Sequence, residues 1–234
     1  MTVEVVNLQG GTGGGDPNLF EDTFLGGDQP FVMGTEWEVV LDPNGTEANS
    51  GAQYAGFYNR IVTGLQVGNN LAGQFVPRAF CIPRPLSWSR VRSQSQFAEY
   101  EIITDDSAGG ALTRFGPMCI CNPNLGTTYW CILVVEAPFR LVINRWAAFA
   151  GTDLANTGLN AFAFGDTIAL TADIVSAGAQ VDLEVFVNGV STLSVSDATA
   201  SRLTDGMPGI FTNGASAARE QVMRDFRCGA LSRF

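Results

Sequence analysis

The stretch from residue 181 to residue 195 constrains the fold more than any other part of the chain. In residues 181–187, valine and leucine alternate with Asp182, Glu184 and the less polar Phe186, and this period of two predicts a strand with one buried face. Asn188-Gly189 follows at once, and both residues tolerate the positive φ that a type I′ turn requires. The sequence therefore predicts a tight hairpin whose second strand runs over 190–195.

Most of the remaining chain also has the pattern of short strands separated by turns. Hydrophobic residues make up 46% of the chain, charged residues only 15%, and 27 residues are glycines, which favours strands with glycine-rich turns over solvated helices. Strands are expected at 36–41, 75–82, 86–91, 97–103, 114–121, 129–135, 140–146, 167–172, 180–187, 190–195, 209–211 and 221–226. Turns are expected at 42–45, 105–110, 121–126, 151–159 and 208–209, a loop at 64–70, and one helical turn at 214–220. This spacing predicts a sandwich or a barrel.

Several short motifs together give the chain a family resemblance. The hairpin Val187-Asn188-Gly189 is followed by Thr204-Asp205-Gly206, by Met207-Pro208-Gly209-Ile210 and by a closing segment at 222–226, while 20–37 contains a D-x-F…D…G…W pattern. This order resembles the concanavalin A-like domains of the laminin-G, lectin and glucanase group. The resemblance implies an all-β, antiparallel jelly-roll β-sandwich.

The first 19 residues differ from the rest and are expected to form an extended N-terminal arm. Residues 10–15 are almost all glycine, which is typical of a flexible linker. The β-prone tip before the linker contains Val3, Val5, Val6 and Leu8. Two interpretations stay open: an idle tail, or an arm that adds a strand to the sheet edge of a neighbouring subunit. Residues 20–234 are expected to form a single jelly-roll domain.

The side-chain inventory excludes most common catalytic plans. The chain contains no histidine, and all 13 of its basic residues are arginines, so relays through histidine, imidazole metal ligands and Schiff-base or P-loop lysines are absent. Glucanases of the resembling group carry an E-x-D-x-x-E triplet that flanks the glycosidic bond, and this chain has none. Glu99 and Glu101 alternate with apolar residues, which indicates the solvated side of a strand. We expect no enzymatic activity, no catalytic residue and no cofactor.

Net charge argues against a nucleic-acid partner. The formal charge is −10, whereas phosphate binding needs clustered cations. The one basic cluster, Arg84, Arg90 and Arg92 around Trp88, could stack on a base. We interpret it instead as a strand edge whose arginines cover an aromatic ring or pair with acids.

The five cysteines are interpreted as free thiols in the core. Cys119 and Cys121 lie two apart in an expected strand, so both should point to one face. No second pair has metal-ligand spacing, and the odd count argues against a complete disulfide framework. The N-terminus lacks the pattern of a signal peptide, and no apolar run is long enough to cross a bilayer. These features indicate assembly in a reducing cytoplasm, with no membrane insertion.

Loop aspartates and tryptophans suggest another type of site. Calcium takes several oxygen ligands, which Asp105-Asp106, Asp166 or Asp205 could supply, but aspartate is also a default turn residue, so no metal site is assigned. Four tryptophans could provide a platform for a sugar ring. Trp37 and Trp130 lie in apolar strand contexts and are interpreted as core.

Two functions from different classes follow. Sandwiches of the resembling group occur in bacteriophages as capsid decoration proteins, head fibres and tail adhesins. The resemblance therefore implies a non-enzymatic virion structural protein, made in the host cytoplasm. Its arm would bind other copies of itself and a capsid or tail protein through Val3, Val5, Val6 and Leu8. The alternative is a carbohydrate-binding adhesin module that recognises host-surface glycans.

Overall fold

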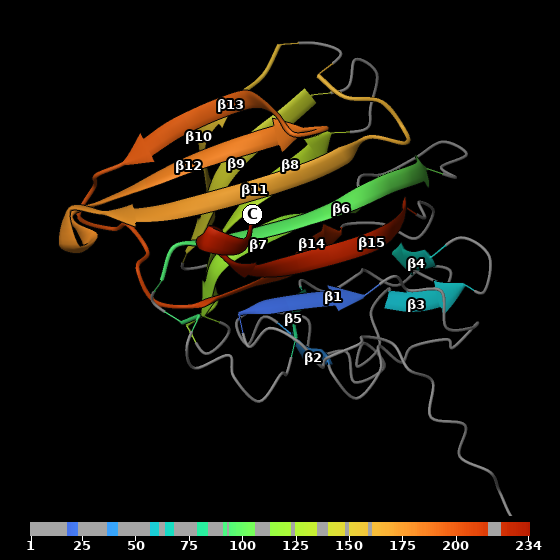
Figure 1. Ribbon diagram of the computed structural model, residues 1–234, viewed down its shortest axis with the longest axis horizontal. Coiled ribbons are helices and arrows are strands. Elements are labelled where there is room, and N and C mark those ends of the chain that lie inside the picture. Colours follow the sequence, from blue (N-terminus) through green and yellow to red (C-terminus); the bar gives the residue numbers. More distant parts are fainter. Residues whose placement is uncertain are drawn as a thin grey trace, which may run out of the picture.

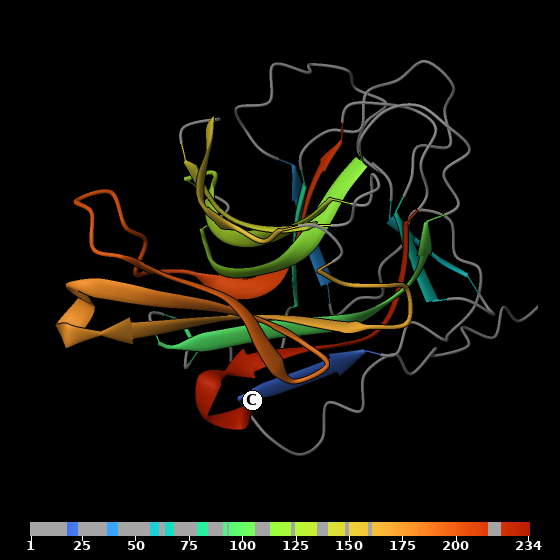
Figure 2. The same ribbon diagram turned by 90° about the horizontal axis from the view of Figure 1, so that it is seen from above.

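The chain folds into two antiparallel sheets that lie face to face as two layers (Figure 1 and Figure 2). The computed structural model describes residues 18–22, 37–41, 57–60, 64–67, 79–83, 91–92, 94–105, 113–122, 125–134, 140–147, 150–158, 161–214 and 221–234. These residues form fifteen strands and two one-turn 3₁₀ helices. None of the helices in these ranges has the length and apolar character needed to cross a membrane. The expectation of an all-β antiparallel sandwich is confirmed.

The first sheet has eight strands in the order β13-β12-β11-β6-β15-β4-β3, with β1 pairing with β15. The bounds are β1 Leu19–Asp22, β3 Phe57–Arg60, β4 Gly64–Val67, β6 Gln96–Asp105, β11 Thr167–Val175, β12 Gln180–Val187, β13 Val190–Asp197 and β15 Gln221–Ala230. Helix η3 (Ser176–Gly178) connects β11 to β12, and helix η4 (Leu231–Arg233) follows β15. Strand β13 therefore forms one edge of this sheet, at the top of Figure 1.

The second sheet has seven strands in the order β10-β9-β8-β7-β14-β5-β2. The bounds are β2 Trp37–Leu41, β5 Ala79–Pro83, β7 Thr113–Asn122, β8 Thr127–Val134, β9 Arg140–Ala147, β10 Ala150–Asn156 and β14 Met207–Gly214. Its green and yellow strands bow in Figure 2, with the hollow side turned away from the other sheet. Neighbours such as β7 and β14 are distant in sequence, as the long connections of Greek-key sandwiches require.

The hairpin predicted from the sequence is present. Asn188 and Gly189 have φ angles of 51° and 75°, as a turn with two positive φ values demands. The Asn188 side chain also accepts a bond from the Thr167 N–H at 2.9 Å and donates one to Asp166 at 2.7 Å. The turn is thus anchored to the start of β11, and the apolar residues at 181, 183 and 185 are buried.

The main core lies between the two sheets and is formed by the inward residues of both. Inward side chains of β11 and β12 meet those of β7, β8 and β9. The cluster includes Ala98, Tyr100, Ile102, Cys119, Tyr129, Cys131, Leu141, Ile143, Ile168, Leu170, Val181, Leu183, Val185, Ile210 and Phe226. Burial of this apolar surface is the main driving force for the sandwich.

A bulge in β7 changes which way its cysteines point. Ile120 has φ 52°, and the register between β7 and β8 shifts after Cys119. Cys119 therefore lies in the core between the sheets, whereas Cys121 lies on the opposite face of the seven-stranded sheet. The expectation that both thiols share one face was wrong, because an extra residue in one strand breaks the alternation.

A buried glutamine holds this bulge in place. The Gln96 side chain accepts a bond from the Ile120 N–H at 3.0 Å and donates to the carbonyls of Val91 and Gly206 at 3.0 and 2.6 Å. A Cβ at Gly206 would lie 2.5 Å from the backbone of Cys121, so the segment leading into β14 can approach this closely only with glycine. This close approach explains the glycine in the motif Thr204-Asp205-Gly206.

Other expectations for local structure need correction. Residues 151–159 were expected to form a turn, but Ala150–Asn156 is an edge strand, and Gly64–Val67 is a strand rather than a loop. Pro208-Gly209 lies inside β14, where a register shift absorbs the proline, rather than at a corner. Val91 lies in a turn and not in a strand, while 86–90 and 215–220 fall outside the described residues.

Candidate functional site

The clearest candidate site is a groove on the outer face of the eight-stranded sheet, over β11, β12 and β13. We name it the outer-face groove, and its volume is about 480 Å³. Its lining includes Leu231 and Phe234 next to the C-terminus, and the outer face of this sheet is the side toward the viewer in Figure 1. Its described lining residues are Thr171, Asp173, Asp182, Leu183, Glu184, Phe186, Ser194, Val195, Ser196, Leu231 and Phe234.

Strand alternation brings the acidic side chains of this groove together. Because the odd-numbered residues of β12 point into the core, Asp182 and Glu184 point outward. Asp173 of β11 is the direct cross-strand partner of Asp182, and Ser194 and Ser196 of β13 are the partners of Glu184 and Asp182. The groove therefore has a floor of carboxylates and hydroxyls on three adjacent strands.

Each of the three carboxylates is held by one of its oxygens. Oδ1 of Asp182 accepts bonds from Ser196 Oγ at 2.6 Å and from Gln180 Nε2 at 2.5 Å. Ser191 donates to Oε1 of Glu184 in the same way.

The third carboxylate follows the same pattern. Ser95 Oγ donates to Oδ1 of Asp173 at 2.5 Å. Within the described part of the chain, the second oxygen of each carboxylate has no such partner and is available to a ligand.

Aromatic rings form one wall of the groove. The ring of Phe234 lies between those of Phe186 and Phe97, at centroid distances of 5.0 and 5.3 Å. Phe234 is 42% exposed, whereas Phe97 is buried beneath it. On the far side, the Arg227 guanidinium lies over the Phe97 ring at 5.5 Å and pairs with Glu99. The wall is thus buried on one side and open to solvent on the other.

This arrangement suits a ligand with hydroxyl or ammonium donors and an apolar face. Carboxylates accept hydrogen bonds from such donors, and an exposed phenyl face packs against C–H groups. The described residues that line the groove include no arginine, so an anionic ligand would meet uncompensated negative charge.

A second surface has similar chemistry but is closed. We name it the aromatic face: the outer side of the seven-stranded sheet, formed by Phe80, Ile82, Met118, Cys121, Trp130, Ile132, Val142, Trp146 and Phe211. Trp130 meets Phe211 edge-on at a centroid distance of 4.6 Å, and Phe80 stacks on Phe211 at 4.8 Å. Trp130 is only 1% exposed, so these rings cannot act as an open platform for a ligand.

Three polar side chains at the aromatic face are joined by hydrogen bonds. Trp130 Nε1 donates to Asn144 Oδ1 at 2.9 Å, and Asn144 Nδ2 donates to Asp153 Oδ1 at 2.7 Å. The three residues lie opposite one another on β8, β9 and β10. Only Asp153, at the sheet edge, is exposed.

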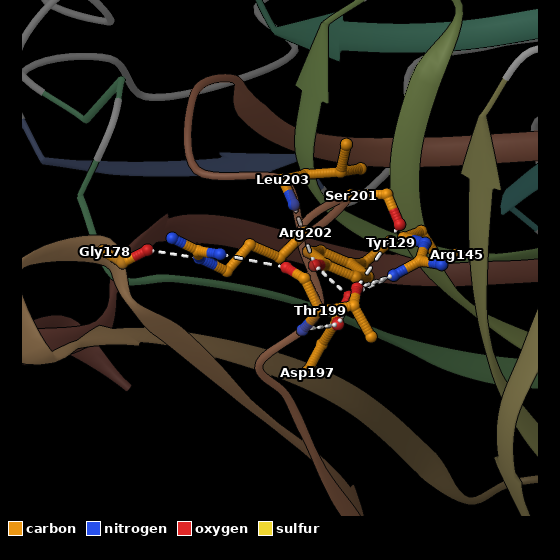
Figure 3. A network of polar contacts seen from close by, with 8 residues as sticks. All are labelled: Tyr129, Arg145, Gly178, Asp197, Thr199, Ser201, Arg202 and Leu203. Carbon is orange, nitrogen blue, oxygen red and sulfur yellow. Dashed lines mark hydrogen bonds and ion pairs between the residues drawn. The ribbon is translucent and has the colours of Figure 1, made fainter.

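A polar network around the buried Asp197 joins the segment that follows β13 to β8 and β9 (Figure 3). Oδ2 of Asp197, which is 2% exposed, accepts bonds from the Tyr129 hydroxyl and from Arg145, both at 2.7 Å. Oδ1 accepts bonds from the Thr199 N–H at 3.0 Å and from its hydroxyl at 2.6 Å. The Tyr129 hydroxyl accepts the Leu203 N–H at 2.9 Å. The network therefore fixes the segment that follows β13 against β8 and β9.

The electrostatics of this network suit a structural role. Burial raises the pKa of Asp197, but the hydrogen bonds from Thr199, Tyr129 and Arg145 outweigh burial and hold the pKa below its ordinary value. Burial raises the pKa of Tyr129, so its hydroxyl stays protonated and keeps donating. The pair is fixed in one protonation state at neutral pH.

The carboxylates singled out in the sequence lie outside the groove. Glu99 and Glu101 are half-buried on the outer face of β6, beside a hollow of about 400 Å³, while their neighbours Ala98, Tyr100 and Ile102 are buried. This confirms the interpretation of a half-buried strand. Glu99 pairs with Arg227.

The loop aspartates and the arginine cluster are engaged with their own chain. Asp166 accepts bonds from the Ala163 N–H at 2.6 Å and from Asn188, and Asp205 pairs with Arg92 at 2.6 Å. Arg92 therefore pairs with an acid, as one of the two interpretations expected, but it lies in a turn and not on a strand edge. The side chains of Asp105-Asp106, Arg84, Trp88 and Arg90 fall outside the described residues. The described residues contain no group of three or more acidic or cysteine side chains arranged to hold a metal.

The described cysteines are buried and free, as expected for core thiols. They are Cys119, Cys121, Cys131 and Cys228. Burial raises the pKa of each thiol, so the nucleophilic thiolate is suppressed at neutral pH.

Two sequence expectations about binding residues have different outcomes. Val3, Val5, Val6 and Leu8 lie outside the described residues. Trp130 is buried as expected, although on the aromatic face rather than between the sheets. Sequence reasoning missed Phe186 and Phe234; the only local signal was an aromatic residue on the polar side of an alternating strand.

No protein-family model and no curated protein sequence matches the chain, whereas solved structures do. It is similar to the carbohydrate binding module CBM66 from Bacillus subtilis, at 12% identity and TM-score 0.52, over 84% of this chain and 96% of that one. An endo-1,3-β-glucanase from Streptomyces sioyaensis matches at 13% identity and TM-score 0.54, over 91% and 96%. The carbohydrate recognition domain of Emp47p matches at 10% identity and TM-score 0.51, over 92% and 96%.

These similarities define the class of the domain by its fold. The chain is a concanavalin A-like jelly-roll sandwich, as the sequence motifs implied. At identities of 10–13% the likeness is one of fold, and residue roles do not carry over.

Proposed function

We propose that this chain is a non-catalytic carbohydrate-binding domain that holds an uncharged or cationic glycan in the outer-face groove. The observation that carries the proposal is the combination of an aromatic wall with three carboxylates, each oriented through one oxygen and open at the other. Binding sites for small ligands typically combine apolar walls with a few convergent polar groups on a rigid scaffold. Sugars present both an apolar ring face and many hydroxyl donors.

The structural neighbours support this proposal at the level of class. Two of the three reported above are described as binding or recognising carbohydrate, and none of the three is described as a virion protein. The virion role expected from the sequence, with its arm and its phage context, stays a prediction. The glycan-binding alternative is the one that the groove supports.

The proposal is non-catalytic because the expected catalytic arrangement has no counterpart in the sequence. Hydrolysis of a glycosidic bond needs an acid and a base or nucleophile that flank the bond. The chain lacks the E-x-D-x-x-E triplet, and Glu99 is engaged by Arg227. We expect a bound oligosaccharide to be recovered intact, with no new reducing ends.

The test is a glycan-array screen of the full-length protein, followed by calorimetry on the strongest neutral or amino-sugar glycan. Asp182→Asn should weaken that binding by about tenfold or more, because a hydrogen bond to a charged acceptor is worth about 1.5–3 kcal/mol. Glu21→Gln is the matched control, since it removes the same charge from an exposed site on β1, outside the groove. An array on which the folded protein binds no glycan, or only acidic ones, contradicts the proposal.

A further inference from the structure

We propose that the β13 edge accepts an added strand from a second copy of this chain, supplied by residues 3–8 of that copy. The two partners of the contact are an edge without the usual protection and a β-prone segment on a glycine-rich tether. The inference is independent of glycan binding, since it concerns backbone pairing at the rim of the sheet.

Strand β13 is an edge that lacks most protective devices. Among the described strands it pairs with β12 alone. Residues 190–196 contain no charged side chain and no proline, and most of them are exposed, with Val190 at 67%. Natural sheets usually protect such an edge with charges, proline or bulges, because unpaired backbone groups recruit another strand. Here one bulge, at Thr192, leaves a regular run at 193–197.

One edge of the other sheet, strand β10, is better protected. Strand β10 carries the exposed charge of Asp153, and its register shifts between Asp153 and Ala155. Beyond its end, the Thr157 N–H bonds back to the Leu141 carbonyl at 2.9 Å. Between β10 and β13, the contrast favours β13 as the edge that receives the added strand.

The N-terminal segment fits this edge by its alternation. Leu193 and Val195 are partly buried on the inner side of β13, while Ser194 and Ser196 are exposed on the outer side. A strand with Val3 and Val5 on its inner side extends the apolar row, and its Glu4 then lies on the outer side in solvent. Residues 9–18, half of them glycine, would link this strand to its own β1.

The tether favours pairing between copies over pairing within one chain. Five inter-strand steps separate β1 from β13, so a strand added beyond β13 lies six steps from β1, which is about 29 Å at the usual strand spacing. An antiparallel strand would also end at the opposite end of the sheet from Asn18, which raises the span to roughly 33 Å. Ten residues reach about 33 Å when fully extended and have a root-mean-square span of only about 17 Å. Pairing with a neighbouring copy needs no such stretching.

The test is disulfide trapping between two different variants of the full chain, each with one added cysteine. Purified Glu4→Cys protein is mixed with Ser194→Cys protein, oxidised with diamide and resolved on a non-reducing gel. Facing positions on adjacent strands lie within disulfide range. We expect at least tenfold more heterodimer than for Glu4→Cys mixed with Thr152→Cys, which places an exposed thiol on the β10 edge. Wild-type protein oxidised alongside measures the contribution of the native cysteines.

Three results would overturn the proposal. Heterodimer at the wild-type level shows that the arm does not reach β13 of another copy. Equal trapping by the β10 variant shows an unspecific encounter. A double variant, Glu4→Cys with Ser194→Cys, that cross-links only within single chains shows that the arm pairs with its own sheet.

Discussion

The outer-face groove and the aromatic face contain similar chemical groups, and they differ in what those groups contact. In the groove the Phe234 ring is 42% exposed, and the carboxylates of Asp182 and Glu184 keep an oxygen open. On the aromatic face the Trp130 ring is 1% exposed, and its N–H is bonded to Asn144. Aromatic rings beside amides and acids therefore do not identify a binding site by themselves. A binding site also needs rings that are exposed and hydrogen-bonding atoms that are open to a ligand.

This difference assigns the two faces to different tasks. The aromatic face contributes to stability, because its rings are removed from water and the polar groups of Trp130, Asn144 and Asp153 bond to one another. We expect the groove to contribute little to stability, and we propose that it binds a ligand. Three substitutions separate these tasks, and a fourth, at Asp197, tests the buried polar network; they are taken here from the largest expected effect on stability to the smallest.

Trp130→Ala should give the largest loss of stability. Removing a buried tryptophan leaves a cavity among Phe211 and its neighbours, and the free energy of unfolding should fall by about 3–5 kcal/mol. Denaturant unfolding followed by circular dichroism measures the change. A loss below about 1 kcal/mol would mean that the aromatic face is not part of the core.

Asn144→Ala should lower the free energy of unfolding by a smaller amount, about 1–3 kcal/mol. The reason is that it leaves the Trp130 N–H buried without its acceptor. Asp153→Asn is the control, since the exposed Asp153 can be replaced without leaving a buried group unpaired. The same unfolding experiment compares them. Equal losses of unfolding free energy in the two variants would show that Asn144 does not stabilise the protein through its bond to the buried Trp130.

Asp197→Asn should destabilise the protein in a pH-dependent way. The folded-state pKa of Asp197 is lowered, so the carboxylate's contribution is fully present above the ordinary pKa of about 3.9 and is lost as the pH falls through the lowered value. The stability gap between wild type and variant should therefore be largest near pH 7 and shrink below pH 4. A gap that stays constant across unfolding curves at pH 7, 5 and 3 would contradict this origin.

Phe234→Ala should have the smallest effect on stability, below about 1 kcal/mol, since much of the ring is already in water. Its effect on glycan affinity should be larger, at roughly three- to tenfold, because a packed aromatic contact contributes about 0.5–1.5 kcal/mol. Leu125→Ala, at an exposed apolar position in the β7–β8 turn, is the control for both measurements. Unchanged affinity in Phe234→Ala would remove the aromatic wall from the site.

The sequence predicted the features that depend on local pattern. The alternation at 181–187 and the turn at Asn188-Gly189 depend on strand periodicity and on positive φ, and both can be read within ten residues. The sandwich followed from many such strands together. The strand at 150–156 was missed because its glycine, threonine and aspartate are turn formers, and pairing with β9 overrides that preference.

Features that depend on distant contacts could not be read in this way. The bulge at Ile120 separates Cys119 from Cys121, and it is held by Gln96, which lies 24 residues earlier in the chain. The groove also depends on contacts between distant residues, because it combines strands β11, β12 and β13 with Phe234 at the C-terminus. Periodicity assigned the polar residues of β12 to the outer face, but it gave no sign of the aromatic wall beside them.

The most direct test of this account is to map a bound glycan onto the two faces. Amide chemical shifts of isotope-labelled protein would be recorded by NMR while the strongest glycan from the array is added. The account predicts shifts concentrated in β12, β13 and residues 231–234, with little change around Trp130 and Asn144. Shifts concentrated on β8, β9 and β10, with the groove unchanged, would contradict it.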